Sequence, residues 1–242
     1  MSRILVNGVS SSTIAASLTT ILTFVVLCAP PAIAQNADMQ AKIAQVTEAS
    51  KANKMALSHY NWQESVTTSI KGEVKKQQVF LVSIGPDGQQ QKSEINAQPD
   101  QARGGPLKRK IVAKKKAEYK DYGEQIADLA RQYTQPDPDR LQRAYAQGNI
   151  ALQLGGGENT MTLIVKNYIK PNDSLTLVYD KPQKMIQSIR VASYLDDPAD
   201  AVTIAAQMAK LPNGISHVTG TQIHGDSKQL TVVTQNSNYS PL

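Results

Sequence analysis

The second half of the chain consists of short β-type segments divided by turn-forming residues, and this pattern constrains the fold more than any other feature. Proline, glycine, asparagine and aspartate separate nearly all of the segments, as at Lys170–Asp173 and Leu211–Gly214. Such spacing is typical of an antiparallel meander. The predicted strands are Ile150–Leu154, Thr160–Tyr168, Ser174–Tyr179, Met185–Tyr194, Ala201–Lys210, Ser216–Ile223 and Lys228–Thr234.

The first half combines helices with a β-hairpin. Apolar residues at helical spacing predict a helix from Asp38 to about His59. A period of two then places Tyr60, Trp62, Val66 and Ile70 on one face of a strand. Val79–Ile84, the turn Gly85–Gly88 and a return strand through Ile95 predict a hairpin, which includes Phe80.

A helical hairpin is predicted between these two β regions, at about 107–148. Leu107–Tyr133 has apolar residues in one helical stripe, and Pro136 ends it. Asp137 is expected to cap a second short helix that begins at Pro138 and ends near Gly148. The predicted fold class is α+β: a β-rich incomplete antiparallel barrel, or half-barrel, covered by the leading helix and the inserted hairpin.

The amino terminus has the pattern of a secretory signal. Arg3 precedes an apolar stretch from Ile14 to Leu27, and Ala32-Ile33-Ala34 forms a cleavage site before Gln35. We therefore expect a signal peptide over 1–34, a single mature domain over 35–242, and a periplasmic or secreted location. The mature chain of 208 residues would carry a net charge of +5 and no cysteine, because Cys28 lies in the signal.

The order of these elements resembles the periplasmic lipoprotein-carrier superfamily, which includes LolA, LolB and the RseB amino-terminal domain. Tyr60-Asn61-Trp62, then Gly72-Glu73-Val74 and Val79–Gly88, look like the first hairpin of that fold. The resemblance implies an apolar cavity for acyl chains or for a partner's peptide. The family's Arg-Pro-Gly-x-Phe-Arg-Trp signature has no counterpart here, so the resemblance carries the architecture and not the carrier activity.

Basic residues are concentrated in the first part of the long helix. Seven lysines and arginines lie between Lys108 and Lys120, with Glu118 as the single acid among them. Lys108 and Lys115 fall on the same helical stripe as Ile111, Tyr119 and Tyr122. Either this half of the helix projects beyond the core, or it borders a cavity, where the lysine stems contact apolar groups and the ammonium groups meet an anionic headgroup.

Residues for catalysis or metal binding do not form a recognisable motif. His217 and His224 have opposite strand parity, no Gly-x-Ser-x-Gly motif is present, and the three consecutive glycines at 155–157 do not precede a helix. We therefore predict no catalytic residues, no metal and no cofactor. Base-stacking and base-reading motifs are absent too, so nucleic acid is not an expected partner.

The sequence favours a non-enzymatic extracytoplasmic protein that holds an apolar ligand, a lipid or a lipidated partner in the half-barrel. An envelope sensing or assembly module that binds a protein is the alternative, and a hydrolase is the third hypothesis. Peripheral contact with an anionic membrane is also expected from the basic helix. The residues expected to line the cavity or its rim are Tyr60, Trp62, Phe80, Lys108, Ile111, Lys115, Tyr119 and Tyr122.

Overall fold

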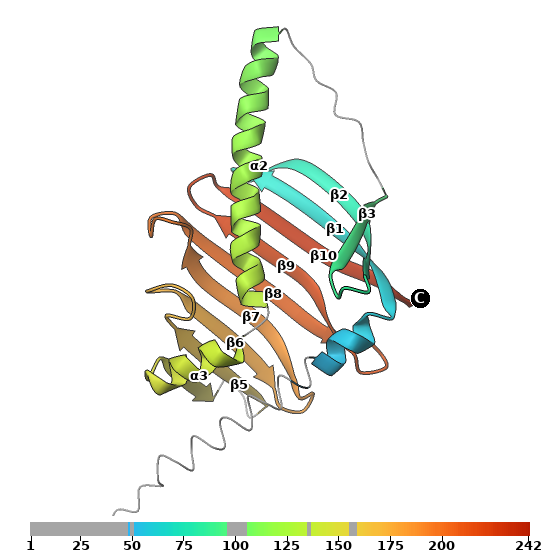
Figure 1. Ribbon diagram of the computed structural model, residues 1–242, viewed down its shortest axis with the longest axis vertical. Helices are drawn as coiled ribbons and strands as arrows, with labels where there is room; N and C mark the ends of the chain where they lie inside the picture. The colour runs from blue at the N-terminus through green and yellow to red at the C-terminus, as the bar shows by residue number, and fades with distance from the viewer. Residues whose placement is uncertain (1–47, 49–50, 96–105, 135–136, 155–158) are drawn as a thin grey trace, which may run out of the picture. The chain divides into compact units, whose positions relative to one another are not determined.

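The protein is built on one ten-stranded antiparallel sheet with the strand order β3-β2-β1-β10-β9-β8-β7-β6-β5-β4. The computed structural model describes residue 48 and residues 51–95, 106–134, 137–154 and 159–242. All described residues belong to one unit, Met39–Leu242. Strands β3 and β4 are the two edges, so the sheet is open and does not close into a barrel (Figure 1).

Strands β1 and β2 form a long hairpin that feeds the edge strand β3. They span Tyr60–Ile70, Glu73–Ile84 and Gln90–Glu94. The β1–β2 turn consists of Lys71 and Gly72, both with positive φ (53° and 78°), which is the conformation of a tight two-residue hairpin turn. This turn extends β2 back to Glu73, six residues before the predicted start at Val79.

The remaining strands form a meander in which each strand pairs with the next one along the chain. Their bounds are β4 Ile150–Leu154, β5 Thr160–Lys166, β6 Ser174–Asp180, β7 Met185–Tyr194, β8 Ala201–Lys210, β9 Ser216–Gly225 and β10 Leu230–Pro241. Three of the predicted strands have the observed bounds (β4, β7 and β8). Tyr168, predicted to lie in a strand, belongs instead to the β5–β6 connection.

The last strand joins the two β regions. β10 pairs with β1 from Ile70↔Leu230 to Tyr60↔Pro241, and the register shifts once, opposite Asn61 and Gln63. Asn238 has a positive φ of 56° at this bulge, where β10 holds one residue more than β1. β10 therefore extends seven residues past the predicted end at Thr234, and it makes a single sheet of the two regions.

Two helices occur between β3 and β4, as predicted. α2 spans Pro106–Thr134 and α3 spans Pro138–Ala146. Asp137 caps α3 by accepting hydrogen bonds from the backbone N–H groups of Asp139 and Arg140. A helical segment at 51–57 precedes β1; most of the leading helix predicted from Asp38 lies outside the described residues.

The main core lies between α2, α3 and one face of strands β5–β10, which we call the inner face. Tyr122, Ile126, Leu129 and Tyr133 of α2 are buried at successive steps of three or four residues. The strands contribute Val165, Leu175, Leu177, Ile189, Val191, Val202, Ile204, Ala206 and Leu230. The structure confirms the predicted fold class, an α+β half-barrel with helices on one face of an open antiparallel sheet.

Candidate ligand-binding site

A second buried group lies on the inner face, outside the main core cluster. Ile70 of β1 packs against the core, and strand alternation places Trp62 and Glu64 on the same face as Ile70. Trp62 is opposite Val82 of β2, and these side chains are 2% and 0% exposed. Neither belongs to the cluster beneath α2. This end of the sheet therefore buries a separate set of side chains.

The centre of this group is a pair of stacked aromatic rings. Trp62 and Tyr239 of β10 have ring centroids 5.4 Å apart and an interplanar angle of 18°. The indole Nε1 of Trp62 is buried and has no hydrogen-bond partner among the described residues. Most buried polar atoms in native proteins do have a partner, and leaving one unpaired costs about 1–3 kcal/mol.

Tyr239 connects Trp62 to a second unpaired atom. The Tyr239 hydroxyl and the Asn236 Nδ2 both donate to the carbonyl of Val218, at 3.1 and 3.0 Å. The Oδ1 of Asn236 is buried, and within the described part of the chain it accepts no hydrogen bond. Within the described residues, one donor and one acceptor are thus left unsatisfied in the same neighbourhood.

A charged pair borders the aromatic pair. Glu64 is only 6% exposed, and its carboxylate accepts a hydrogen bond from the Lys92 ammonium group at 2.5 Å. Lys92 is the register partner of Val82, so its stem crosses β2 to reach Glu64. Burial, and secondarily the negative charge of Glu64, raise the pKa of Tyr239, which stays protonated at neutral pH.

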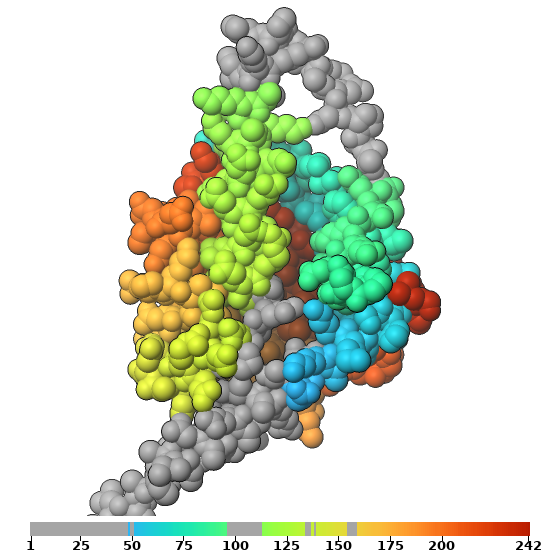
Figure 2. All heavy atoms as spheres, viewed as in Figure 1, coloured from blue at the N-terminus to red at the C-terminus, as the bar shows by residue number. Residues whose placement is uncertain are grey.

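The helical segment at 51–57 contacts the end of the sheet beside this group. Asn53 makes two hydrogen bonds with the backbone of Ser216 in β9, donating to the carbonyl at 2.8 Å and accepting from the N–H at 2.7 Å. The same helical segment also contacts the β2–β3 turn, where Lys54 lies next to Gly88. Figure 2 shows a hollow between α2 and the teal β2–β3 strands, with red atoms of the carboxyl-terminal strands at its floor.

Tyr122 holds α2 against the sheet at one point. Its hydroxyl donates to the carboxylate of Asp200 at 2.6 Å. Burial and this carboxylate raise the pKa of Tyr122. Its ring lies directly on Gly225 at the end of β9, where an added Cβ would be only 2.7 Å from the ring carbon Cε1. Glycine is therefore required at this position for α2 to approach the strand.

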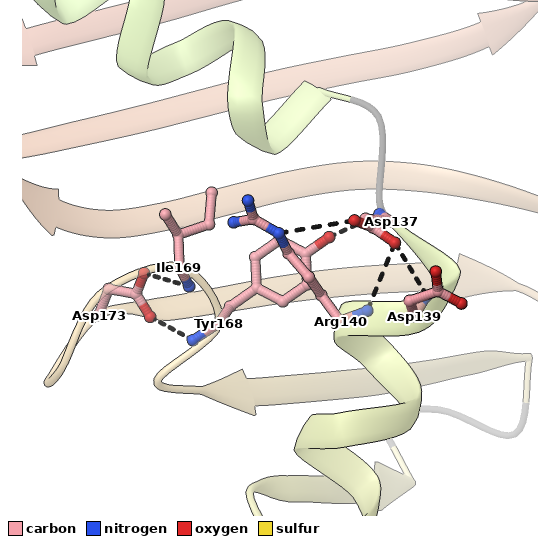
Figure 3. A network of polar contacts seen from close by, with 6 residues as sticks. All are labelled: Asp137, Asp139, Arg140, Tyr168, Ile169 and Asp173. Carbon is pink, nitrogen blue, oxygen red and sulfur yellow. Dashed lines mark hydrogen bonds and ion pairs between the residues drawn. The ribbon is translucent and has the colours of Figure 1, made fainter.

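Tyr133 holds α2 at a second point, three turns further along. Its hydroxyl donates to the carboxylate of Asp173, which is 2% exposed and also accepts from the N–H groups of Tyr168, Ile169 and Lys170. Figure 3 shows part of this network, in which the Asp137 N–H donates to the Tyr168 hydroxyl at 2.6 Å. With four donors around it, the Asp173 carboxylate ties the helical hairpin to the β5–β6 turn.

The structure places the predicted site residues in two groups. Tyr60, Trp62 and Phe80 lie at the β1–β2 end, and the Tyr60 hydroxyl accepts from Asn213 Nδ2 at 2.6 Å. On α2, Lys115 is exposed, Tyr119 is half-buried and Tyr122 is buried in the core. The side chains of Lys108 and Ile111 lie outside the described residues.

Four members of the Trp62 group were not among the predicted residues: Glu64, Lys92, Asn236 and Tyr239. Glu64 has the same parity as Trp62 on β1, and this parity was the available signal for its burial. Asn236 and Tyr239 follow the predicted end of the last strand, and nothing in their local pattern indicates that they pair with β1. Among the described residues, no three His, Cys, Asp or Glu side chains are grouped to hold a metal ion.

No family model matches the chain, and no curated protein matches it. The fold is similar to the crystal structure of a DUF1329 family protein from Desulfovibrio piger ATCC 29098, with 13% sequence identity over 86% of this chain and 92% of that one. The TM-score of 0.38 marks a distant similarity.

Proposed function

We propose that the protein is a non-enzymatic binding protein that works outside the cytoplasm and holds the acyl chain of a lipid or lipidated partner beside Trp62. The observation that carries the proposal is the buried indole N–H of Trp62, which has no hydrogen-bond partner among the residues that the structure describes and lies on the inner face of an open sheet. The secretory pattern of residues 1–34 supports the location.

The chemistry around Trp62 favours an amphiphile with an oxygen-bearing group. The Trp62 N–H can donate to a carboxylate or ester oxygen, and the Asn236 amide oxygen can accept from a hydroxyl or amide group. The half-buried Phe80 supplies apolar surface on the adjacent strand. Ligand sites commonly combine mostly apolar walls with a few polar groups that fix orientation.

Polar residues elsewhere in the structure support binding over catalysis. The Asp173 carboxylate accepts four hydrogen bonds, so its lone pairs are engaged in holding the turn and α2. His224 lies between Thr231 and Asp226, with its two ring nitrogens 2.8 and 3.1 Å from their oxygens. These contacts are those of residues that stabilise the fold.

The experiment is native mass spectrometry of the protein recovered from the cells that make it, followed by titration with a fluorescent fatty acid. We expect a co-purifying acyl-bearing molecule, and saturable probe binding. Trp62→Phe keeps an aromatic ring but removes the N–H donor, so the affinity for the probe should fall about tenfold.

Tyr133→Phe is the matched control, because it removes a buried hydroxyl from the main core and leaves the Trp62 group unchanged. Its probe affinity should equal that of the wild type. A protein that purifies empty and ignores the fatty acid would refute the proposal, and would favour a module that recognises a protein partner.

A further inference from the structure

Between Ala113 and Glu118, α2 is exposed on every side. All six residues from Ala113 to Glu118 are exposed, whereas Tyr122, Ile126 and Leu129 further along are buried. Six consecutive residues turn through more than one full helical turn, so nothing in the described structure covers any side of the helix here. Figure 1 shows this part of α2 extending beyond the strands.

The amino-terminal part of α2, residues 106–120, which we call the arm, carries a concentrated positive charge. Lys108 to Lys120 contains seven basic residues and one acid, Glu118. Lys114, Lys115 and Lys116 are exposed and are separated by about 100° each around the helix axis. The charge is therefore distributed around the arm and is not confined to one face.

The rest of α2 fixes the position of the arm. The hydrogen bonds of Tyr122 to Asp200 and of Tyr133 to Asp173 hold the following turns against the sheet. The arm is about 20 Å long at the rise of an α-helix. None of the helices in the described residues is long and apolar enough to cross a bilayer.

We propose that this arm docks the protein on the surface of an anionic lipid bilayer. A partner protein would contact one face of a helix, whereas attraction to a layer of anionic headgroups does not depend on direction and uses cations all around the arm. Each lysine or arginine near such a surface strengthens binding by a factor of about five. Attraction of this kind decreases with salt, because it is screened within a Debye length.

The test is co-sedimentation with vesicles of phosphatidylcholine alone or mixed with phosphatidylglycerol, using protein recovered from the cells that make it. Wild type should bind the mixed vesicles at low salt, and should bind them less at high salt. The variant Lys114→Gln/Lys115→Gln should bind them about thirtyfold more weakly, since two surface lysines are neutralised.

The matched control is Lys166→Gln/Lys210→Gln, which makes the same change of net charge at exposed residues on strands β5 and β8. It should bind like the wild type, and circular dichroism should show all three proteins folded. Equal losses in both variants, or binding that is unaffected by phosphatidylglycerol, would overturn the proposal. Binding of wild type to polyglutamate but not to the mixed vesicles would assign the arm to an acidic protein partner instead.

Discussion

The hydroxyl of Tyr133 in α2 donates a hydrogen bond to the carboxylate of Asp173, a residue far along the sequence in the β5–β6 turn. The same hydroxyl is 2.9 Å from the Ser193 Oγ of β7. One helical side chain thus connects a turn and a strand, and burial, followed by the bond to Asp173, raises the pKa of Tyr133. From this contact we expect two effects of a Tyr133 variant, one on stability at neutral pH and one on stability at alkaline pH.

Tyr133→Phe should destabilise the protein by about 1–3 kcal/mol at neutral pH, because the buried Asp173 carboxylate loses one of its donors. In the wild type, the pKa of Tyr133 is higher in the folded state than the value of about 10 in the unfolded state. The contribution of Tyr133 to the free energy of unfolding is therefore fully present below about pH 10 and decreases as the pH rises above it. The variant should show a shallower fall. Urea denaturation at neutral pH and at about pH 11 measures both effects, and an identical pH dependence in the two proteins would contradict them.

Gly225→Ala should destabilise the fold by about 1–3 kcal/mol, because its Cβ would overlap the Tyr122 ring and displace α2. Gly123→Ala is the matched control. At Gly123 the nearest atom to an added Cβ is Leu230 Cδ2 at 3.5 Å, an ordinary contact. Alanine in the helix interior should therefore stabilise by about 0.5–1 kcal/mol. Thermal denaturation should show shifts of opposite sign, and equal shifts would show that Tyr122 does not lie on Gly225.

Lys92→Met should destabilise the protein by about 1–3 kcal/mol, because it leaves the buried carboxylate of Glu64 without its cation. Because the Lys92 side chain is 39% exposed, the loss of stability should be smaller than for a fully buried pair. The double variant Lys92→Met/Glu64→Gln removes both charges and should regain most of the loss. Chemical denaturation of the wild type, of Lys92→Met and of the double variant measures both effects, and a double variant no more stable than Lys92→Met would argue against the pair.

The predicted signal peptide leads to a measurable amino terminus. Intact-mass measurement of exported protein should give a chain that begins at Gln35, after cleavage behind Ala34. A retained Met1, or a diacylglyceryl group on Cys28, would contradict this and would place the protein on a membrane by a different route.

Turn chemistry made most of the sheet predictable from sequence. Proline, glycine and asparagine mark the ends of β6, β7 and β8, and local alternation identifies the strands between them. The pairing of β10 with β1 could not be predicted in this way, since residues Asn236–Ser240 are mainly polar and their partners lie at the other end of the chain. Strand parity correctly placed Trp62 on the same face as Ile70, which packs against the core, whereas its stacking on Tyr239 depends on that long-range pairing.

The Asp173 network shows a different limit of local reasoning. Lys170–Asp173 was predicted to be a turn, and the structure has a turn there. Its aspartate is buried because α2 brings the Tyr133 hydroxyl above it, and the approach of a distant helix leaves no mark on the turn's own sequence. Polar residues that are buried by tertiary contact, such as Asp173 and Glu64, are therefore the residues that the sequence identified least well.

The fluorescence of Trp62 tests the central claim most directly, because it is the only tryptophan in the chain and all indole emission reports on the candidate site. The measurement is a titration with a brominated fatty acid, whose bromine atoms quench indole at close range, beside the unbrominated acid of equal length. We predict saturable quenching by the brominated acid, reversed by an excess of the unbrominated one. Indole emission that does not change when native mass spectrometry shows the brominated acid bound would contradict a site beside Trp62, and absence of binding would contradict the proposed function itself.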